Sequence, residues 1–293
     1  MAARKRNKFS TSVDQALEEV QRKMAQRAGV KRTGKRAAPA PATKAGAAEA
    51  GRESYFQLSR SLSAGFIAAL PLLAIYEIGV LSMVGRDINA AAQIFKAPIS
   101  WLKSNPTELL GTDPILVING VLIVAAFFAL WRLGQRGGLN PGTFGGMFVE
   151  SVTYALLLGP LALFMLTGRL QFGGFNPDFS AFGWKVVASA GAGLYEELIF
   201  RAILLGAIYT VCHDGLNLRP FTAGAMGLLL SGAVFSAAHF LSPGETANYP
   251  AFLYRLFAGM FLGGIFLTRG FGIAAWTHAL YDIYILCFAG WKA

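Results

Sequence analysis

From Ser61 onward the chain alternates between long apolar runs and short polar segments. A helix of about 20 residues crosses the hydrocarbon core of a bilayer. Seven runs approach or exceed this length, near residues 61–84, 113–133, 146–168, 184–212, 220–241, 250–268 and 270–290. Backbone groups in lipid must be hydrogen-bonded internally, and the runs lack the period-two alternation of barrel strands. The pattern therefore predicts an all-α fold, a polytopic transmembrane helical bundle.

The segment from Ile88 to Leu102 leaves the number of spans open between seven and eight. It is short and carries Lys96 and Pro98 in its middle. We interpret it as a helix that lies in the membrane interface. The alternative, an eighth span, would invert the orientation of everything that follows.

The composition is typical of a membrane protein, and the charge distribution distinguishes the N-terminal segment from the rest of the chain. Hydrophobic residues make up 54% of the chain and charged residues 14%, against about 25% charged in soluble proteins. Residues 1–52 hold 13 Lys and Arg against 4 Asp and Glu, so most of the net charge of +10 lies there. We therefore expect no nucleic-acid groove. We expect residues 1–58 to be a basic, largely disordered tail and 59–293 to be the transmembrane domain.

The positive-inside rule places this basic tail in the cytoplasm. The tail either binds anionic lipid headgroups, since each Lys or Arg near such a surface contributes about 1 kcal/mol, or only sets the topology. Together with the short loops, the pattern suggests an integral protein of a bacterial cytoplasmic membrane, surrounded by membrane lipid.

Ionisable side chains inside apolar spans are candidates for function, because a charge at the bilayer centre costs about 2.5–3.5 kcal/mol. Glu196 and Glu197 lie within the run 184–212, and Arg201 follows Glu197 by four residues. Glu197 and Arg201 can therefore pair on one helix face. Glu196 is left without a partner on its own helix, and a buried carboxylate of this kind suits a general base.

Two later spans carry similar residues at helical spacing. His239 follows Phe235 by four residues in the run 220–241, and Asp282 follows His278 by four residues in the run 270–290. Residues four apart share a helix face. The clustering of ionisable residues in these spans predicts one shared polar site.

Other charges in or near the spans are given smaller roles. Glu77 and Glu150 are isolated acids in the first and third predicted spans, and we expect each to make a local polar contact. Arg269 lies in the connection between the last two predicted spans, where we treat it as a loop charge.

Three motifs in these spans, taken in order and spacing, resemble the CAAX protease and bacteriocin-processing family of intramembrane endopeptidases (CPBP, or Abi). The motifs are Glu196-Glu197-x-x-x-Arg201, Phe235-x-x-x-His239 and His278-x-x-x-Asp282. The likeness covers residues 184–290, which it marks as the catalytic core. It implies that Glu197 and Arg201 form a supporting pair.

The resemblance also implies a reaction, the hydrolysis of a peptide bond in a membrane-proximal or lipidated protein or peptide. Glu196 with His239 would activate a water molecule. His278 and Asp282 would stabilise the oxyanion or orient the site. Which peptide or protein is the substrate is not encoded in these motifs.

Asp282 departs from the family pattern, in which this position is commonly Asn. An ionised Asp cannot donate a hydrogen bond to an oxyanion. Asp282 is therefore protonated, orients His278, or binds a metal. Two histidines and a carboxylate are the ligands of several hydrolytic zinc sites, so Glu196, His239 and His278 are the candidate ligands. We expect no cofactor, with zinc as the alternative.

Two functions of other classes stay open. In a proton-coupled transporter the buried acids and histidines would relay protons. A non-catalytic scaffold could retain the peptidase fold, because a fold does not determine a function.

Overall fold

The computed structural model describes residues 55–83, 89–92, 124, 127–132, 134–135, 141–171, 175–241, 246 and 248–289. Helices and short connections make up these ranges, and no strand occurs in them. The all-α prediction is therefore confirmed. Residues 1–54 of the predicted tail lie outside the described ranges.

Five helices are long and apolar enough to cross a membrane, and they coincide with five predicted runs. They are α4 (Leu62–Met83), α7 (Pro141–Thr167), α10 (Pro220–His239), α11 (Tyr249–Arg269), and α12 (Phe271–Tyr284) extended by η5 (Ile285–Ala289). A short helix, α3 (Tyr55–Ser59), precedes α4.

The run 184–212 is helical as predicted, but it is not a regular α-helix. It consists of α8 (Phe182–Gly191), η2 (Ala192–Glu196), η3 (Leu198–Leu205), α9 (Gly206–Thr210) and η4 (Val211–Gly215). The η segments are π-helical, and the Gly206 N–H accordingly donates to the carbonyl of Arg201, five residues back. Apolar periodicity identifies a helix but not the size of its hydrogen-bonded rings, so the sequence did not predict these π-helical turns. Such turns frequently accompany functional sites.

Two predicted segments lie largely outside the described residues. Within the run 113–133, residues 124 and 127–132 are described and are helical. Of the segment from Ile88 to Leu102 the structure describes 89–92, where a helical turn follows Asn89. The count of seven or eight spans therefore stays a prediction.

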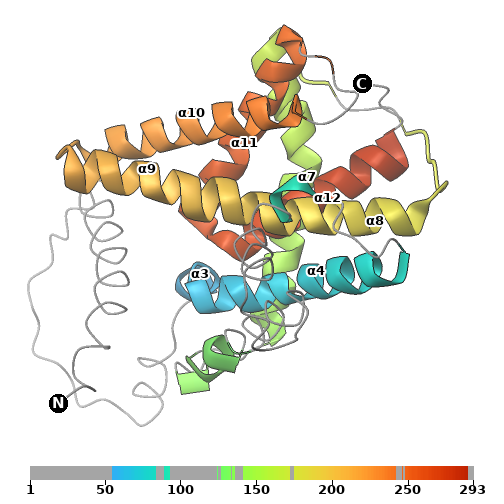
Figure 1. Ribbon diagram of the computed structural model, residues 1–293, viewed down its shortest axis with the longest axis horizontal. Helices are drawn as coiled ribbons and strands as arrows, with labels where there is room; N and C mark the ends of the chain where they lie inside the picture. The colour runs from blue at the N-terminus through green and yellow to red at the C-terminus, as the bar shows by residue number, and fades with distance from the viewer. Residues whose placement is uncertain are drawn as a thin grey trace, which may run out of the picture. The chain divides into compact units, whose positions relative to one another are not determined.

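Helix α12 packs against α4, α7, α8, η2 and α11. Figure 1 shows α8 and α9 along one line, with α10 on one side and α4 on the other, while α7 crosses them steeply. The central place of α12 brings its side chains to η2 and to the end of α10.

Glycines let α12 approach its neighbours closely. A Cβ atom on Gly193 would lie 2.5 Å from the carbonyl oxygen of Ala275. A Cβ atom on Gly272 would lie 2.7 Å from the carbonyl oxygen of Gly65. Only glycine allows backbones to touch in this way, so α12 is held directly against both η2 and α4.

A proline in α4 is matched by a tryptophan in α12. Pro71 has no N–H group, which weakens helical hydrogen bonding in the turn before it. The indole Nε1 of Trp276 donates to the carbonyl of Ala68 in that turn, at 2.6 Å. This hydrogen bond joins α12 to α4 in the turn that Pro71 weakens.

The two isolated acids each have a polar partner. Tyr195 donates to Glu77 Oε1 at 2.5 Å. Glu150 instead binds Arg269, whose Nε and Nη2 atoms lie 2.8 and 3.0 Å from its two oxygens. Arg269 also donates to Ser59 Oγ at 3.0 Å. The interpretation of Arg269 as a loop charge is wrong, because it is buried at the end of α11.

Candidate active site

Glu197 lies at the buried centre of the site, where one of its oxygens contacts both His278 and Arg201. Its Oε1 is 2.8 Å from His278 Nδ1 and 3.0 Å from Arg201 Nη1, and the carboxylate and guanidinium side chains are 0% and 1% exposed. Arg201 Nη2 also donates to the carbonyl of Gly259 at 3.2 Å. The predicted Glu197–Arg201 pair is confirmed, and it holds His278 as well.

The ring of Phe235 lies among the charged and imidazole groups of the site. The Arg201 guanidinium carbon is 4.3 Å from its centroid, a cation–π contact. The centroids of His239 and His278 are 4.7 and 5.8 Å away, with both rings edge-on. Phe235 therefore contacts both histidines and limits their rotation.

Hydrogen bonds at Nδ1 determine which nitrogen of each histidine faces the site. His239 Nδ1 lies 2.9 Å from the carbonyl oxygen of Phe235, which can only accept, so this nitrogen carries the proton. His278 Nδ1 donates to the carboxylate of Glu197 by the same argument. In the neutral state each Nε2 is then a hydrogen-bond acceptor.

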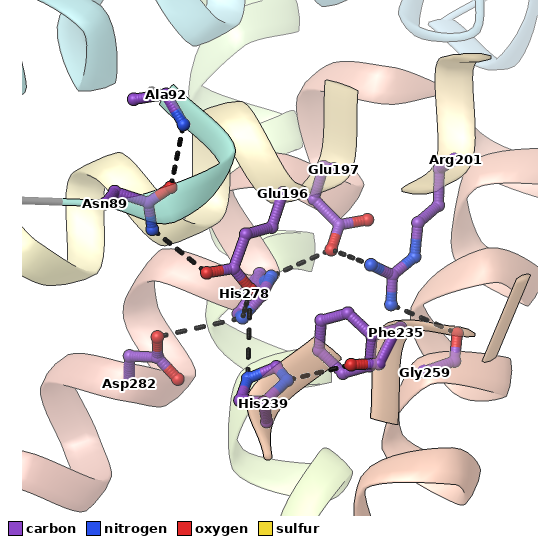
Figure 2. A network of polar contacts seen from close by, with 10 residues as sticks. All are labelled: Asn89, Ala92, Glu196, Glu197, Arg201, Phe235, His239, Gly259, His278 and Asp282. Carbon is purple, nitrogen blue, oxygen red and sulfur yellow. Dashed lines mark hydrogen bonds and ion pairs between the residues drawn. The ribbon is translucent and has the colours of Figure 1, made fainter. Parts of the chain in front are cut away.

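Both Nε2 atoms point toward one oxygen of Glu196 (Figure 2). Glu196 Oε2 lies 3.9 Å from His239 Nε2 and 4.0 Å from His278 Nε2. These separations exceed a hydrogen bond and suit a bridging water. Oε2 is buried and has no hydrogen-bond partner among the described residues. Its partner oxygen, Oε1, accepts from Asn89 Nδ2 at 3.0 Å.

Asp282 completes the predicted set at the edge of the site. Its Oδ2 lies 3.7 Å from His278 Nε2, which confirms that the two residues share a helix face. The structure thus brings together the six side chains that the sequence singled out, namely Glu196, Glu197, Arg201, His239, His278 and Asp282.

Asn89 is the site residue that sequence reasoning missed. It lies 107 positions before Glu196, in a segment interpreted only as an interfacial helix. The available signal was its place just before Ala90–Ala92, since Asn is a preferred residue at helix N-caps.

The donor types suit zinc, but their arrangement does not. Among the residues that the structure describes, no group of three or more His, Cys, Asp or Glu side chains is placed so that it could hold a metal ion. Zinc binding by Glu196, His239 and His278 therefore stays a prediction.

Comparison with known proteins agrees with the motifs. Residues 178–284 match the family described as type II CAAX prenyl endopeptidase Rce1-like. The chain has no significant match among the curated proteins or the solved structures. With its five apolar helices, the chain is an integral membrane protein. The match spans the elements that carry Glu196, His239 and His278, and in this segment the chain is similar to the CAAX protease (CPBP) family.

Proposed function

We propose that this chain is an intramembrane endopeptidase that hydrolyses a peptide bond in a membrane-proximal or lipidated protein or peptide. The observation that carries the proposal is the convergence of two imidazole Nε2 atoms on the unpartnered Oε2 of Glu196. The Rce1-like match of residues 178–284 supports the same reaction class.

Glu196 and His239 activate the water. A water molecule in the 3.9 Å gap between Glu196 Oε2 and His239 Nε2 donates one hydrogen bond to each. Glu196 takes a proton as the water oxygen adds to the peptide carbonyl. Glu196 then passes this proton to the leaving nitrogen as the C–N bond breaks, and the products are a carboxylic acid, which keeps the second water proton, and an amine.

His278 stabilises the oxyanion of the tetrahedral intermediate. When doubly protonated it donates from Nδ1 to Glu197 and from Nε2 to the oxyanion. Asp282, with Oδ2 at 3.7 Å from Nε2, supports the charged imidazole and orients it. This assignment does not require Asp282 itself to donate a hydrogen bond to the oxyanion.

We propose that the reaction proceeds without a metal, which the lack of a suitable ligand arrangement in the described residues supports. Dialysis of the purified protein against a strong chelator should leave the cleavage rate unchanged. Loss of cleavage that added zinc restores would establish the zinc alternative.

The remaining features of the proposal concern the setting of the site. We propose seven spans, counting the helix 182–215 and the run 113–133 with the five apolar helices. The basic tail then lies on the cytoplasmic side of a bacterial membrane and binds anionic lipid headgroups. Labelling of single cysteines from either side of sealed vesicles tests this topology.

The test of the activity is cleavage of a defined peptide by the purified, reconstituted protein. A fluorogenic peptide is supplied with and without a prenyl group. Glu196→Gln and His239→Ala should each lower kcat at least about 100-fold, the usual contribution of general acid–base catalysis.

His213→Ala is the matched control. His213 Nδ1 lies 2.9 Å from the carbonyl of Leu218, much as His239 Nδ1 lies 2.9 Å from that of Phe235, but His213 belongs to η4 rather than to the site. Its removal should leave cleavage unchanged. Equal cleavage by the wild type and all three variants would overturn the assignment.

A further inference from the structure

The Asn89 side chain bridges a helix start and the catalytic carboxylate (Figure 2). Its Oδ1 accepts from the backbone N–H of Ala92 at 3.0 Å, and its Nδ2 donates to Glu196 Oε1 at 3.0 Å. The amide oxygen thus accepts within its own helical turn, and the amide nitrogen donates to a distant helix.

The orientation of this amide is determined by its partners. A backbone N–H can only donate, so the atom facing Ala92 must be the oxygen. The NH₂ group is then left for the carboxylate, which accepts it. The backbone N–H of Asn89 in turn donates to the hydroxyl of Tyr76 on α4, at 3.2 Å. Asn89 is therefore held from both sides before it contacts Glu196.

The hydrogen bond to Oε1 has a consequence for Oε2. A glutamate side chain has three rotatable bonds, and among the described residues Asn89 is the hydrogen-bond donor found for Glu196. With Oε1 bound to Asn89, the second oxygen is directed at His239 and His278. The bond to Asn89 therefore favours the rotamer that faces the two histidines.

We propose that Asn89 is a positioning residue that orients the Glu196 carboxylate for water activation. The inference rests on the proposed function. Asn89 and Tyr76 lie outside the Rce1-like match at 178–284, so the N-terminal part of the membrane domain contributes to the site through them.

The test uses Asn89→Asp. Aspartate is as good an N-cap as asparagine, so the bond to the Ala92 N–H is kept while the donor to Glu196 is replaced by a carboxylate oxygen that repels it. We expect kcat to fall about 10-fold or more with KM little changed, and the melting temperature to fall less than in Asn89→Ala. Asn89→Ala should lower both kcat and the melting temperature.

Asn248 supplies the matched control, because its Oδ1 caps α11 by accepting from the Ala251 N–H at 2.8 Å. Its Nδ2 contacts a loop carbonyl, that of Thr246, rather than the site. Asn248→Asp should leave kcat unchanged. A purely structural role for Asn89 predicts the same behaviour for Asn89→Asp as for Asn248→Asp.

The outcomes separate this inference from the proposed function. If Glu196→Gln abolishes cleavage while Asn89→Asp cleaves like the wild type, the positioning role is wrong and the peptidase stands. If Glu196→Gln cleaves like the wild type, the peptidase mechanism itself is wrong. Loss of kcat in Asn89→Asp together with intact Asn248→Asp supports both.

Discussion

Two glutamate–arginine pairs among the described residues, one part-buried and one fully buried, differ in how many of their polar atoms are hydrogen-bonded. Glu150 binds Arg269 through both carboxylate oxygens, and the guanidinium also reaches Ser59. Glu197 binds Arg201 and His278 through Oε1, and its Oε2 has no hydrogen-bond partner in the part of the chain that the structure describes. The first pair joins α3, α7 and α11, whereas the second lies inside the candidate site.

The difference indicates what each pair is for. A bidentate pair with both oxygens occupied fixes neighbouring helices and leaves nothing for a ligand. Buried polar atoms without partners are rare in folded proteins, and functional sites are one place where they occur. Glu196 Oε2 and Glu197 Oε2 are two such atoms on adjacent residues. The comparison therefore predicts a stability role at Glu150–Arg269 and a catalytic role around Glu197.

The largest effect is expected from Arg269→Met, which leaves the part-buried Glu150 carboxylate without its two hydrogen bonds from the guanidinium. A hydrogen bond to a charged group contributes about 1.5–3 kcal/mol, so the free energy of unfolding in micelles should fall by about 2–3 kcal/mol. The rate of cleavage per folded molecule should be unchanged.

Adding Glu150→Leu to Arg269→Met provides the control, because an apolar replacement of both partners is often nearly neutral. The double variant should recover most of the lost stability. A fall in kcat that persists in it would contradict a purely structural role.

A smaller effect, on activity rather than folding, is expected from Arg201→Lys. The lysine keeps the charge but loses the bond to the Gly259 carbonyl and the planar contact with Phe235. A loss of about 1–2 kcal/mol in orienting Glu197 and His278 corresponds to roughly a tenfold lower kcat. Steady-state kinetics should show this lower kcat at a nearly constant KM. An unchanged kcat with reduced stability would mean that the Glu197–Arg201 pair, like Glu150–Arg269, has a structural role.

Ser59→Ala should have a weaker effect at the structural pair. It removes one hydrogen bond to Arg269, and such a bond contributes about 1 kcal/mol. Chemical unfolding should detect that loss, and cleavage should not change. A variant as unstable as Arg269→Met would show that Ser59, rather than Glu150, is the main partner.

Most of the fold and six of the site residues could be predicted from the sequence, because a membrane constrains both the length of its helices and the placement of charges within them. An apolar run long enough to span is recognised by length alone, and a charge within it, such as Glu196 or Arg201, stands out by its cost. The partners of Glu150 and Glu196 were not found, because they lie 119 and 107 positions away in the chain. Asn89 carries no charge and lies beside a polar segment, so its hydropathy does not distinguish it from its neighbours in the sequence. The π-helical turns were missed because periodicity does not report ring size.

The smallest effect is expected from a third pair, at the exposed connection before α8. Lys185 Nζ donates to Asp178 Oδ2 at 2.7 Å, and this hydrogen bond lowers the pKa of the Asp178 carboxyl well below its ordinary value. Any stabilisation from the pair is therefore present above the ordinary pKa of about 3.9 and is lost as pH falls through the lower folded-state value. Asp178→Asn should cleave the peptide at the wild-type rate. In unfolding curves measured over a series of pH values, the variant should not show the loss of stability that the wild type shows at acid pH.

The central place of α12 has a consequence for how the protein is made. Ribosomes synthesise chains from the N-terminus, and α12 follows every other long helix that the structure describes. His278 and Asp282 are therefore the last parts of the site to be translated, although α12 packs among helices that precede it. Until α12 enters between η2 and α4, the nascent chain carries Glu196 and His239 without their stabilising partner. On the proposed mechanism, the enzyme is inert throughout its own synthesis and gains activity only when its last described helix is inserted.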